Sequence, residues 1–304
     1  MSASPDATVV ITTKDRREEL RTAVESALRQ EGADIEVLVI DDGSSDGTAN
    51  MLQADYPSAR LWREEQSKGL IVRRNQGAHL ANGEVIFSID DDAEFTTPYV
   101  VRQTLDDFEE SCIGAVAIPY MDVNRDSEVR QQAPDDRAVY CTAAYRGTAH
   151  AVRRDLFLEL GGYREHFVHQ GEERDLCVRM LGAGYVVRLG RADHIRHYES
   201  PRRSFERMDF YGRRNDILFA WHNAPTSLLP FYLALETLNT VRTALRHRRF
   251  RSFIRGLLAG YRDCIRYAGK RAPLDFDVFR LYRTLFRKGP LPLEEVRTRL
   301  RGFS

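Results

Sequence analysis

Two groups of aspartates each follow a short apolar segment of the chain. They are Asp41 with Asp42, and Asp90 with Asp91 and Asp92. Neighbouring carboxylates repel each other and raise one another's pKa, so such a group needs a cation or a set of hydrogen-bond donors to offset its charge. An open α/β protein has its binding crevice where the strands of a parallel sheet end. Because hard cations take oxygen ligands, the two groups predict a nucleotide site with a divalent metal ion.

The elements that must position these aspartates alternate between strand and helix patterns, which predicts an α/β fold with a mainly parallel sheet flanked by helices. The expected strands cover 8–12, 35–40, the neighbourhood of Leu61, 85–89, 114–118 and 185–189. The expected helices cover 70–81, 98–111, 153–160 and 172–181, with one that ends before Gly32 and one that continues through Tyr56. Asp15 and Glu18 resemble the capping box that opens a helix. The polar stretch 122–137 predicts an exposed loop.

The composition is that of a globular enzyme, since 304 residues with 42% hydrophobic content can bury a large core. The formal net charge of zero conceals an uneven distribution. Residues 1–200 carry 23 Lys and Arg against 36 Asp and Glu, whereas residues 201–304 carry 22 against 9. The four cysteines lack CxxC spacing, which favours reduced thiols in a cytosolic protein. Residues 1–8 have neither the basic nor the apolar region of a signal peptide, so we expect a cytoplasmic protein.

Five motifs follow one another between residues 8 and 205. They are VVITTKDR, VLVIDDGSSDGT, RRNQGAHLANGEVIFSIDDDAEF, GGYRE and GEERDLCVRMLGAGY. Each motif is weak alone, but in this order the set resembles family 2 of the glycosyltransferases, inverting sugar-nucleotide enzymes with a GT-A fold. The resemblance implies a Rossmann-like GT-A domain over 1–205 and leaves 206–304 as a basic, mainly helical C-terminal extension. It also implies sugar transfer to a glycan or lipid-linked acceptor, in the synthesis of a bacterial cell-surface polysaccharide or glycolipid.

The resemblance places Thr12 and Asp42 against the nucleotide base, with Asp15 close by. An ionised carboxylate only accepts hydrogen bonds, so Asp42 would accept from the imide of uracil. Arg74 would approach the phosphates as a donor fork that is always charged. Arg73 is expected at the surface.

The run of three aspartates fits the DxD motif of the family, in which an aspartate binds Mn²⁺ or Mg²⁺ that bridges the diphosphate. Asp92 is the first choice for the direct metal ligand and Asp90 the second, with Asp91 beside the bound nucleotide. His197 fits the position of a histidine that is a further metal ligand in some relatives, and His194 competes for that role. Two protein carboxylates suffice for such a cation because the substrate adds phosphate oxygens.

Glu172 and Glu173 stand where the family usually has Glu-Asp. Glu173 aligns with the catalytic base, which takes the proton of the acceptor hydroxyl during in-line displacement. Because Glu is one methylene longer than Asp, the role can also fall to Glu172. Gly147, with Thr148 and His150, falls where the family lines the acceptor side.

UDP-sugars are the expected donors, although Lys14 and Asp15 stand where many members have Tyr-Asn, which leaves guanosine and thymidine donors open. Two other functions compete with sugar transfer. A nucleotidyltransferase has the same nucleotide and metal needs, but the chain shows no Gly-rich phosphate loop with a lysine near its start. A non-catalytic protein of the same fold that binds sugar nucleotides or a partner is conceivable because of the Glu-Glu departure.

The basic C-terminal region contains an apolar stretch, 217–241, that polar residues interrupt too often for a membrane-spanning helix. After it, arginines alternate with Phe250, Phe253 and Ile254. Two interpretations stand side by side. The segment forms a helix on an anionic membrane surface, where a peripheral enzyme meets a lipid-linked acceptor, or a helical cap that packs on the core and exposes its arginines to water. No recognised nucleic-acid module is present, so we expect no nucleic-acid partner.

Overall fold

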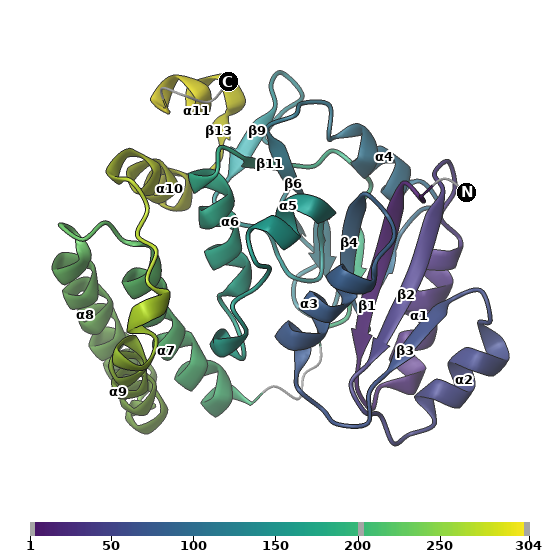
Figure 1. Cartoon of the computed structure of the whole chain (residues 1–304), viewed down its shortest axis with the longest axis horizontal. Coiled ribbons are helices and arrows are strands. Elements are labelled where there is room, and N and C mark those ends of the chain that lie inside the picture. Colours follow the sequence, from purple (N-terminus) through teal and green to yellow (C-terminus); the bar gives the residue numbers. More distant parts are fainter. Residues whose placement is uncertain (1–3, 200–203, 301–304) are drawn as a thin grey trace.

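A computed structural model describes residues 4–199 and 204–300 of the chain (Figure 1). Within these residues, nine strands form one sheet in the order β13-β9-β11-β6-β10-β4-β1-β2-β3. They are β1 (Ala7–Thr13), β2 (Ile35–Asp41), β3 (Arg60–Arg63), β4 (Val85–Asp90), β6 (Ile113–Ala117), β9 (Tyr140–Thr142), β10 (His150–Arg153), β11 (Val186–Leu189) and β13 (Leu291–Pro292). The pairs β1–β2, β1–β4, β2–β3 and β6–β11 are parallel. The predicted α/β fold is confirmed.

Helices cover both faces of this sheet. One face carries α1 (Arg17–Leu28), α2 (Thr48–Asp55) and α4 (Val100–Asp106), and the other carries α3 (Leu70–Leu80), α5 (Arg154–Glu159) and α6 (Glu172–Gly182). Successive side chains of a strand point to opposite faces. Val9 and Ile11 accordingly belong to the core beneath α1, and Val10 belongs to the core beneath α3. Strands buried on both faces explain the nearly continuous apolar runs in the sequence.

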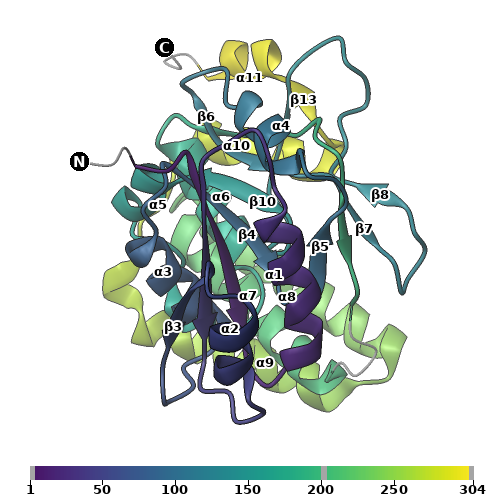
Figure 2. The same cartoon turned by 90° about the vertical axis from the view of Figure 1, so that its right-hand side faces the viewer.

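A second, smaller sheet lies beside the ends of β4 and β6, and no sequence pattern predicted it. Its order is β5-β12-β7-β8, formed by β5 (Ala93–Phe95), β12 (Ile195–His197), β7 (Tyr120–Asp122) and β8 (Val129–Arg130). Figure 2 shows β7 and β8 at one edge of the molecule. The expected exposed loop 122–137 is wrong at its first residue, because Asp122 ends β7 and is buried.

Three other expectations need correction. The strand β10 was not predicted, although it pairs antiparallel with both β4 and β6 in the middle of the main sheet. The helix expected over 98–111 is shorter, since α4 covers only Val100–Asp106. The capping box is also wrong: α1 has Arg16 at its N-cap without a side-chain cap. The N–H of Arg17 instead donates to Asp46, a residue of the next loop in the sheet.

The region after residue 204 is mainly helical, as expected. It contains α7 (Phe205–Asn223), α8 (Leu229–His247), α9 (Phe250–Arg266), α10 (Phe276–Lys288) and α11 (Leu293–Arg299), with a short 3-10 turn at Ala268–Lys270. Ile217 and Leu257 join the core of α6, and β13 extends the main sheet by pairing with β9. None of the described helices is both long and apolar enough to cross a bilayer. The four cysteines, Cys112, Cys141, Cys177 and Cys264, are buried and unbridged.

Candidate functional site

The three consecutive aspartates lie where β4 ends and the small sheet begins. Asp90 is the last residue of β4, and Ala93, directly after Asp92, opens β5. His197 of β12 pairs with Ala93 on one side and with Asp122 of β7 on the other. The backbone pairing of the small sheet therefore brings together acidic and imidazole side chains from distant parts of the sequence.

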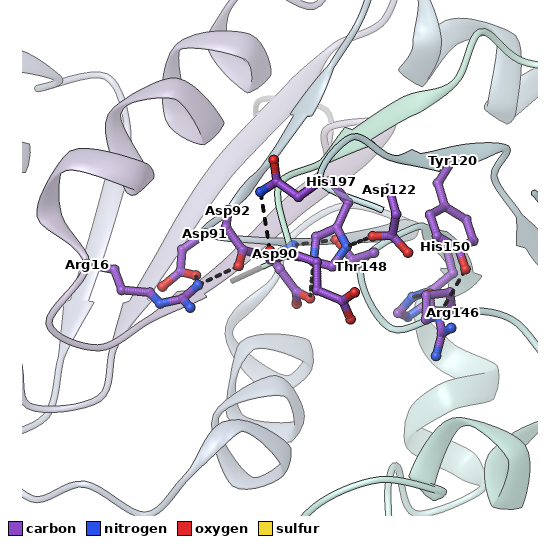
Figure 3. A network of polar contacts seen from close by, with 12 residues as sticks. Arg16, Asp90, Asp91, Asp92, Tyr120, Asp122, Arg146, Thr148, His150 and His197 are labelled. Atoms are coloured by element: carbon purple, nitrogen blue, oxygen red, sulfur yellow. Dashed lines mark hydrogen bonds and ion pairs between the residues drawn. The ribbon is translucent and has the colours of Figure 1, made fainter. Parts of the chain in front are cut away.

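Asp90, Asp92 and His197 form a compact set of candidate metal ligands. One ligand atom from each residue lies within 4.8 Å of the others. Nε2 of His197 lies 3.2 Å from Oδ1 of Asp92 and 3.9 Å from Oδ2 of Asp90 (Figure 3). Two carboxylates and an imidazole are a suitable donor set for a divalent cation such as Mn²⁺. The structure thus brings together the three expected metal ligands, whereas His194 lines a separate cavity.

Asp122 fixes the orientation of His197. Nδ1 of His197 lies 2.5 Å from Oδ1 of Asp122, which directs Nε2 towards the two aspartates of the candidate metal set. Burial lowers the pKa of His197, but the hydrogen bonds to Asp92 and Asp122 and the charges of Asp90 and Asp92 raise it to about 9. A carboxylate on the second ring nitrogen is the usual support of a metal-bound histidine. Sequence reasoning missed Asp122; the available signal was its place directly after the apolar run 113–121.

Arg16 compensates part of the charge of the aspartates. Its Nη1 donates to Oδ1 of Asp91 at 2.9 Å and to Oδ2 of Asp92 at 2.6 Å. Asp91 also accepts a hydrogen bond of 2.8 Å from the hydroxyl of Thr13. Burial raises the pKa of Asp91 to about 7, against the opposing charge of Arg16. Burial also raises the pKa of Asp92, but hydrogen bonds from His197 and Arg16 outweigh it and hold that pKa below its usual range. Arg16 was not predicted, although it belongs to the first motif.

A cavity of about 290 Å³ lies beside the acidic cluster and contains the residues expected at the nucleotide base. Its lining includes Thr12, Lys14, Asp42, Arg73, Asp90, Asp91 and Asp92. The two oxygens of Asp42 accept four hydrogen bonds, from the hydroxyl of Ser67, the N–H groups of Lys68 and Gly69, and Nε of Arg73. Burial raises the pKa of Asp42, but these donors hold it below its usual range.

Arg73 is buried, so the expectation of a surface arginine is wrong. Its side chain is 2% exposed, and its Nε lies 2.6 Å from Oδ1 of Asp42. Its other donors bind the carbonyl of Gln66 and the side chain of Gln76. A buried carboxylate needs a paired charge, and Arg73 supplies the one for Asp42.

Asp15 lies in the loop after β1 and is absent from the lining of that cavity. Its Oδ1 accepts hydrogen bonds from the N–H and the hydroxyl of Ser45, and its own N–H donates to the hydroxyl of Ser44. Its φ is 52°, a left-handed conformation that Asp tolerates better than most residues. In this structure Asp15 ties the loop after β1 to the loop after β2.

Arg74 links the acidic cluster to the two glutamates. Its Nη2 donates to Oδ1 of Asp90 at 2.7 Å. Its Nη1 lies 3.5 Å from Oε1 of Glu173 and 3.6 Å from Oε1 of Glu172. Arg74 is buried and lines a second, larger cavity rather than the one beside Asp42. A single guanidinium therefore contacts both the candidate metal set and the candidate base.

Glu172 and Glu173 are the first two residues of α6 and differ in exposure. The side chain of Glu173 is 19% exposed, against 4% for Glu172. Burial raises the pKa of Glu172 to about 8, with the charge of Glu173 adding to the effect and Arg74 opposing it. Gly147 permits this packing, because a Cβ there would lie 2.4 Å from Oε1 of Glu173. Glu173 is thus the more accessible carboxylate.

The larger cavity has a volume of about 820 Å³ and connects the acidic cluster with the start of α7. Its lining includes Arg16, Arg74, Asp90, Asp122, Arg146, Gly147, Thr148, Glu172, Glu173, His197, Ser204 and Arg207. The hydroxyl of Thr148 accepts a hydrogen bond from the N–H of Asp90. His150 does not line the cavity. It is buried, stacks on Tyr145 and lies 3.1 Å from the hydroxyl of Tyr163, and burial lowers its pKa to about 3.

The C-terminal helices hold the loop that precedes the glutamates. Nδ2 of Asn215 in α7 donates to the carbonyls of Phe167, His169 and Gln170. Within this loop Val168 and Gln170 have positive φ values of 64° and 68°. Such a conformation is unfavourable for a β-branched residue and persists only where the surroundings impose it. Asn215 supplies part of that constraint, a role that no sequence pattern predicted.

Comparisons with known sequences agree on one family. The family model "Glycosyl transferase family 2" matches residues 8–161, half of the chain. The succinoglycan biosynthesis protein ExoO of Rhizobium meliloti is 37% identical over 89 residues, 29% of this chain and 26% of that protein. The glucosyl-dolichyl phosphate glucuronosyltransferase of Haloferax volcanii is 25% identical over 193 residues, 55% of this chain and 59% of that protein. The chain spans less than two thirds of the length of these curated relatives.

Solved structures share the fold at low sequence identity. TarS 1–349 of S. aureus in complex with UDP-GlcNAc has a TM-score of 0.65 and 14% identity, covering 98% of this chain and 91% of that one. The mannosyltransferase PcManGT of Pyrobaculum calidifontis, solved with GDP-Man and Mn²⁺, has a TM-score of 0.59 and 18% identity, covering 93% and 80%. The expected GT-A fold is confirmed by this likeness. With half of its length matched by the family model, the chain belongs to glycosyl transferase family 2.

Proposed function

We propose that this glycosyltransferase is an inverting, metal-dependent hexosyltransferase that moves a sugar from a nucleotide-diphosphate donor to a hydroxyl of a glycan or lipid-linked acceptor. The observation that carries the proposal is the position of Arg74. Its guanidinium contacts Asp90 of the candidate metal set and lies 3.5 Å from Glu173. A group that binds the departing diphosphate and a group that accepts the acceptor's proton are both needed at one reacting centre, and here they share a cavity.

The donor nucleotide is assigned to the cavity beside Asp42, with Thr12 in its lining. All four acceptor positions of Asp42 are filled by residues 67–69 and Arg73, so a uracil imide would replace one of these donors. Asp90, Asp92 and His197 would hold Mn²⁺ or Mg²⁺, which when bound supplies positive charge to the leaving diphosphate. A UDP-sugar is the preferred donor; TarS, of similar fold, was solved with UDP-GlcNAc.

Glu173 is assigned as the general base. It takes the proton of the acceptor hydroxyl while that oxygen bonds to the anomeric carbon, and the electron pair of the breaking bond stays with the diphosphate. Attack from the opposite face inverts the configuration. Glu172 is the weaker candidate because its side chain is more deeply buried than that of Glu173, and burial raises its pKa, which favours the protonated form. A base must be ionised before it can accept a proton.

A bacterial cell-surface polysaccharide or its lipid-linked precursor is the proposed product, made in the cytoplasm at the inner face of the membrane. Names of relatives support this class of acceptor: one acts in succinoglycan biosynthesis and another on glucosyl-dolichyl phosphate. The cavity of about 820 Å³ has room for an acceptor beside the donor sugar.

Donor turnover tests the proposal directly. A panel of UDP-, GDP- and dTDP-sugars is incubated with the native protein in Mn²⁺, Mg²⁺ or EDTA, with and without glycan and lipid-linked acceptors. We expect turnover of one donor that stops in EDTA. Glu173→Gln should lower the rate about 10²–10⁴-fold while donor affinity is kept, and Asp92→Ala should weaken metal-dependent donor binding.

Glu172→Gln is the matched control, since it removes the neighbouring carboxyl with the same change in shape. A larger loss in Glu172→Gln than in Glu173→Gln would reassign the base. Donor binding without turnover across all acceptors would favour the non-catalytic alternative, and release of sugar phosphate with a nucleotidylated product would favour a nucleotidyltransferase. Retention of the anomeric configuration in the product, seen by NMR, would refute direct displacement.

A further inference from the structure

Helix α9 has two faces of different character, and only one is used for packing. Gly256 and Gly260 lie against α7: a Cβ at Gly256 would lie 2.3 Å from the carbonyl oxygen of Phe210, and one at Gly260 would lie 2.8 Å from Ile217. Phe253, which the sequence suggested as a membrane contact, is buried on this packed side. The sequence left a cap on the core and a surface helix as alternatives, and α9 combines the two.

The other face of α9 carries large apolar side chains that the described chain leaves in solvent. Leu258, Tyr261 and Ile265 follow the spacing of one helical stripe. Their exposed fractions are 63%, 37% and 81%. Isoleucine and leucine side chains are rarely exposed to this extent on the same side of a helix. Large exposed apolar patches mark interaction sites in soluble proteins.

Helix α8 continues the same apolar surface. Leu238, Val241 and Leu245 are also exposed and share one stripe of α8. The hydroxyl of Tyr261 forms a hydrogen bond of 2.7 Å with the hydroxyl of Thr237, so the stripes of α8 and α9 lie side by side. The docking face, as we name it, consists of Leu238, Val241, Leu245, Leu258, Tyr261 and Ile265. Figure 1 shows α8 and α9 at the opposite side of the molecule from α1 and α2.

Arginines border this docking face on both sides. By helical spacing, Arg242 and Arg246 flank the stripe of α8, and Arg262 and Arg266 flank that of α9. The two helices contain six arginines but only two acidic residues, Glu236 and Asp263. Asp263 is buried against Arg214.

Glu236 is half-buried. Burial raises its pKa, and the positive charge of Arg174 opposes that shift. Both acidic residues of α8 and α9 are therefore withdrawn from the docking face, whose border is basic.

From these features we infer that the docking face binds the surface of an anionic lipid bilayer. Apolar side chains enter the boundary between headgroups and acyl chains, while the bordering arginines meet anionic headgroups. A second copy of the chain is the poorer occupant. In a two-fold contact the same basic border would meet itself, and like charges across an interface disfavour association.

The location of the catalytic cavity fits this orientation. A cavity of about 290 Å³ between the first turns of α7 and α9 is lined by Ser204, Arg207, Ser252 and Arg255, together with neighbouring residues. Ser204 and Arg207 also line the larger cavity with Glu173. The larger cavity thus adjoins one that reaches Ser252 and Arg255 at the start of α9. Access of a lipid-linked acceptor by this route rests on the proposed function, whereas bilayer binding itself does not.

Vesicle flotation with the full chain tests the inference. We expect the native protein to float with vesicles that contain phosphatidylglycerol, to stay behind with pure phosphatidylcholine, and to be released by high salt. The double variant Leu258→Glu/Ile265→Glu, at two exposed positions, should lower the partition coefficient at least about tenfold. Arg246→Glu/Arg266→Glu should have a similar effect on anionic vesicles.

Controls change the same residue types elsewhere. Phe276→Glu and Arg287→Glu alter exposed residues of α10, outside the docking face, and should float like the native protein. Circular dichroism checks that each variant is folded. The inference would be overturned if the native protein did not bind anionic vesicles. It would also be overturned if the α10 variants lost as much vesicle binding as the docking-face variants.

Two further outcomes are decisive. In the first, analytical ultracentrifugation finds a native dimer that Leu258→Glu/Ile265→Glu makes monomeric, and the native protein binds no vesicles. This result would assign the docking face to a contact between copies and overturn the inference. Vesicle binding by a chain that turns over no donor would uphold the docking face and count against sugar transfer, so the two proposals fail separately.

Discussion

The aspartates of the two acidic groups meet different kinds of partner. Asp42 is saturated by donors of the chain itself, including Arg73. Asp91 is held by Arg16 and a threonine hydroxyl. Asp90 and Asp92 share His197 and form with it a candidate metal site. The repulsion that made these groups conspicuous in the sequence is therefore offset partly by buried arginines and, for one set of side chains, by a site that suits a cation.

The variant Asp122→Asn tests whether Asp122 positions His197. An amide at this position no longer offers a carboxylate to Nδ1 of His197, so the preferred tautomer and the ring orientation change. We expect the affinity of the chain for Mn²⁺ to fall about 10–100-fold, measured by calorimetry or electron paramagnetic resonance without any donor. The unfolding midpoint should change little by comparison.

The control is Asp126→Asn. Asp126 lies four residues after Asp122, and its exposed carboxylate pairs with Arg130. Its Mn²⁺ affinity should match that of the native protein. Equal Mn²⁺ affinities for Asp122→Asn and the native chain would show that His197 needs no such support, or that the metal binds elsewhere.

At the level of elements, the small sheet and the C-terminal helices do most to assemble the site. The sheet β5-β12-β7 aligns Ala93, His197 and Asp122 in neighbouring strands. Helix α7 holds the loop before Glu172 through Asn215. Helix α9 in turn supports α7, since Asp263 binds Arg214 at 2.7 Å. Hydrogen bonds thus connect α9, which carries part of the docking face, through α7 to the loop before α6, where the proposed base lies.

Gly256→Ala tests the contact between α7 and α9. The added Cβ would lie 2.3 Å from the carbonyl oxygen of Phe210, a backbone atom that cannot rotate away. Overpacking of this kind costs about 1–3 kcal/mol of the free energy of unfolding, which urea denaturation measures. Gly269→Ala is the control, because a Cβ there meets nothing within 4 Å. A loss of stability in Gly269→Ala equal to that in Gly256→Ala would contradict close packing as the cause.

On the scale of the whole molecule, charge and burial are distributed unequally. The last 104 residues carry 22 Lys and Arg against 9 Asp and Glu, and the preceding 200 residues show the opposite excess. This polarity suits a protein that turns one end to an anionic surface. The histidines whose pKa is lowered by burial add a second property of the whole fold, because protonating them in the folded chain costs stability.

His166 and His222 make the stability of the fold depend on pH. Their Nε2 atoms lie 2.9 Å apart in a partly buried contact, and burial lowers the pKa of His166 to about 3 and that of His222 to about 4. An unfolded histidine takes up its proton near pH 6.5. Between pH 6.5 and about 4 the unfolded chain therefore binds protons that the folded chain does not, and stability falls as pH falls.

The unfolded His166→Gln variant binds one proton fewer than the unfolded native chain when the pH falls. We expect the loss of unfolding free energy between pH 7 and pH 5 to be smaller than in the native chain by about 2 kcal/mol, measured by urea denaturation at both pH values. His79→Gln changes an exposed histidine of α3 and should leave the native pH dependence intact. Parallel stability curves for His166→Gln and the native chain would mean that His166 is protonated in the folded state.

Local patterns in the sequence were sufficient for the α/β class, most helices and the two acidic groups, whereas the base candidates Glu172 and Glu173 came from the family resemblance. Strands 35–40 and 85–89 and the helix that starts at Glu172 depend on apolar periodicity and turn residues close in sequence. The metal candidates Asp90, Asp92 and His197 came from the family resemblance. Their proximity, within 4.8 Å, is a property of the fold.

The tertiary structure decided what depends on pairing between distant segments. Short strands such as β7 and β12 have too few residues to show a period, so Asp122 was assigned to an exposed loop although it is buried beside His197. Arg73 and Arg74 are adjacent and equally charged, and only the fold sends one to Asp42 and the other to Asp90. The sequence by itself determined which chemical groups are available. Their partners, their burial and the exposed face of α8 and α9 follow from long-range packing, which no local pattern encodes.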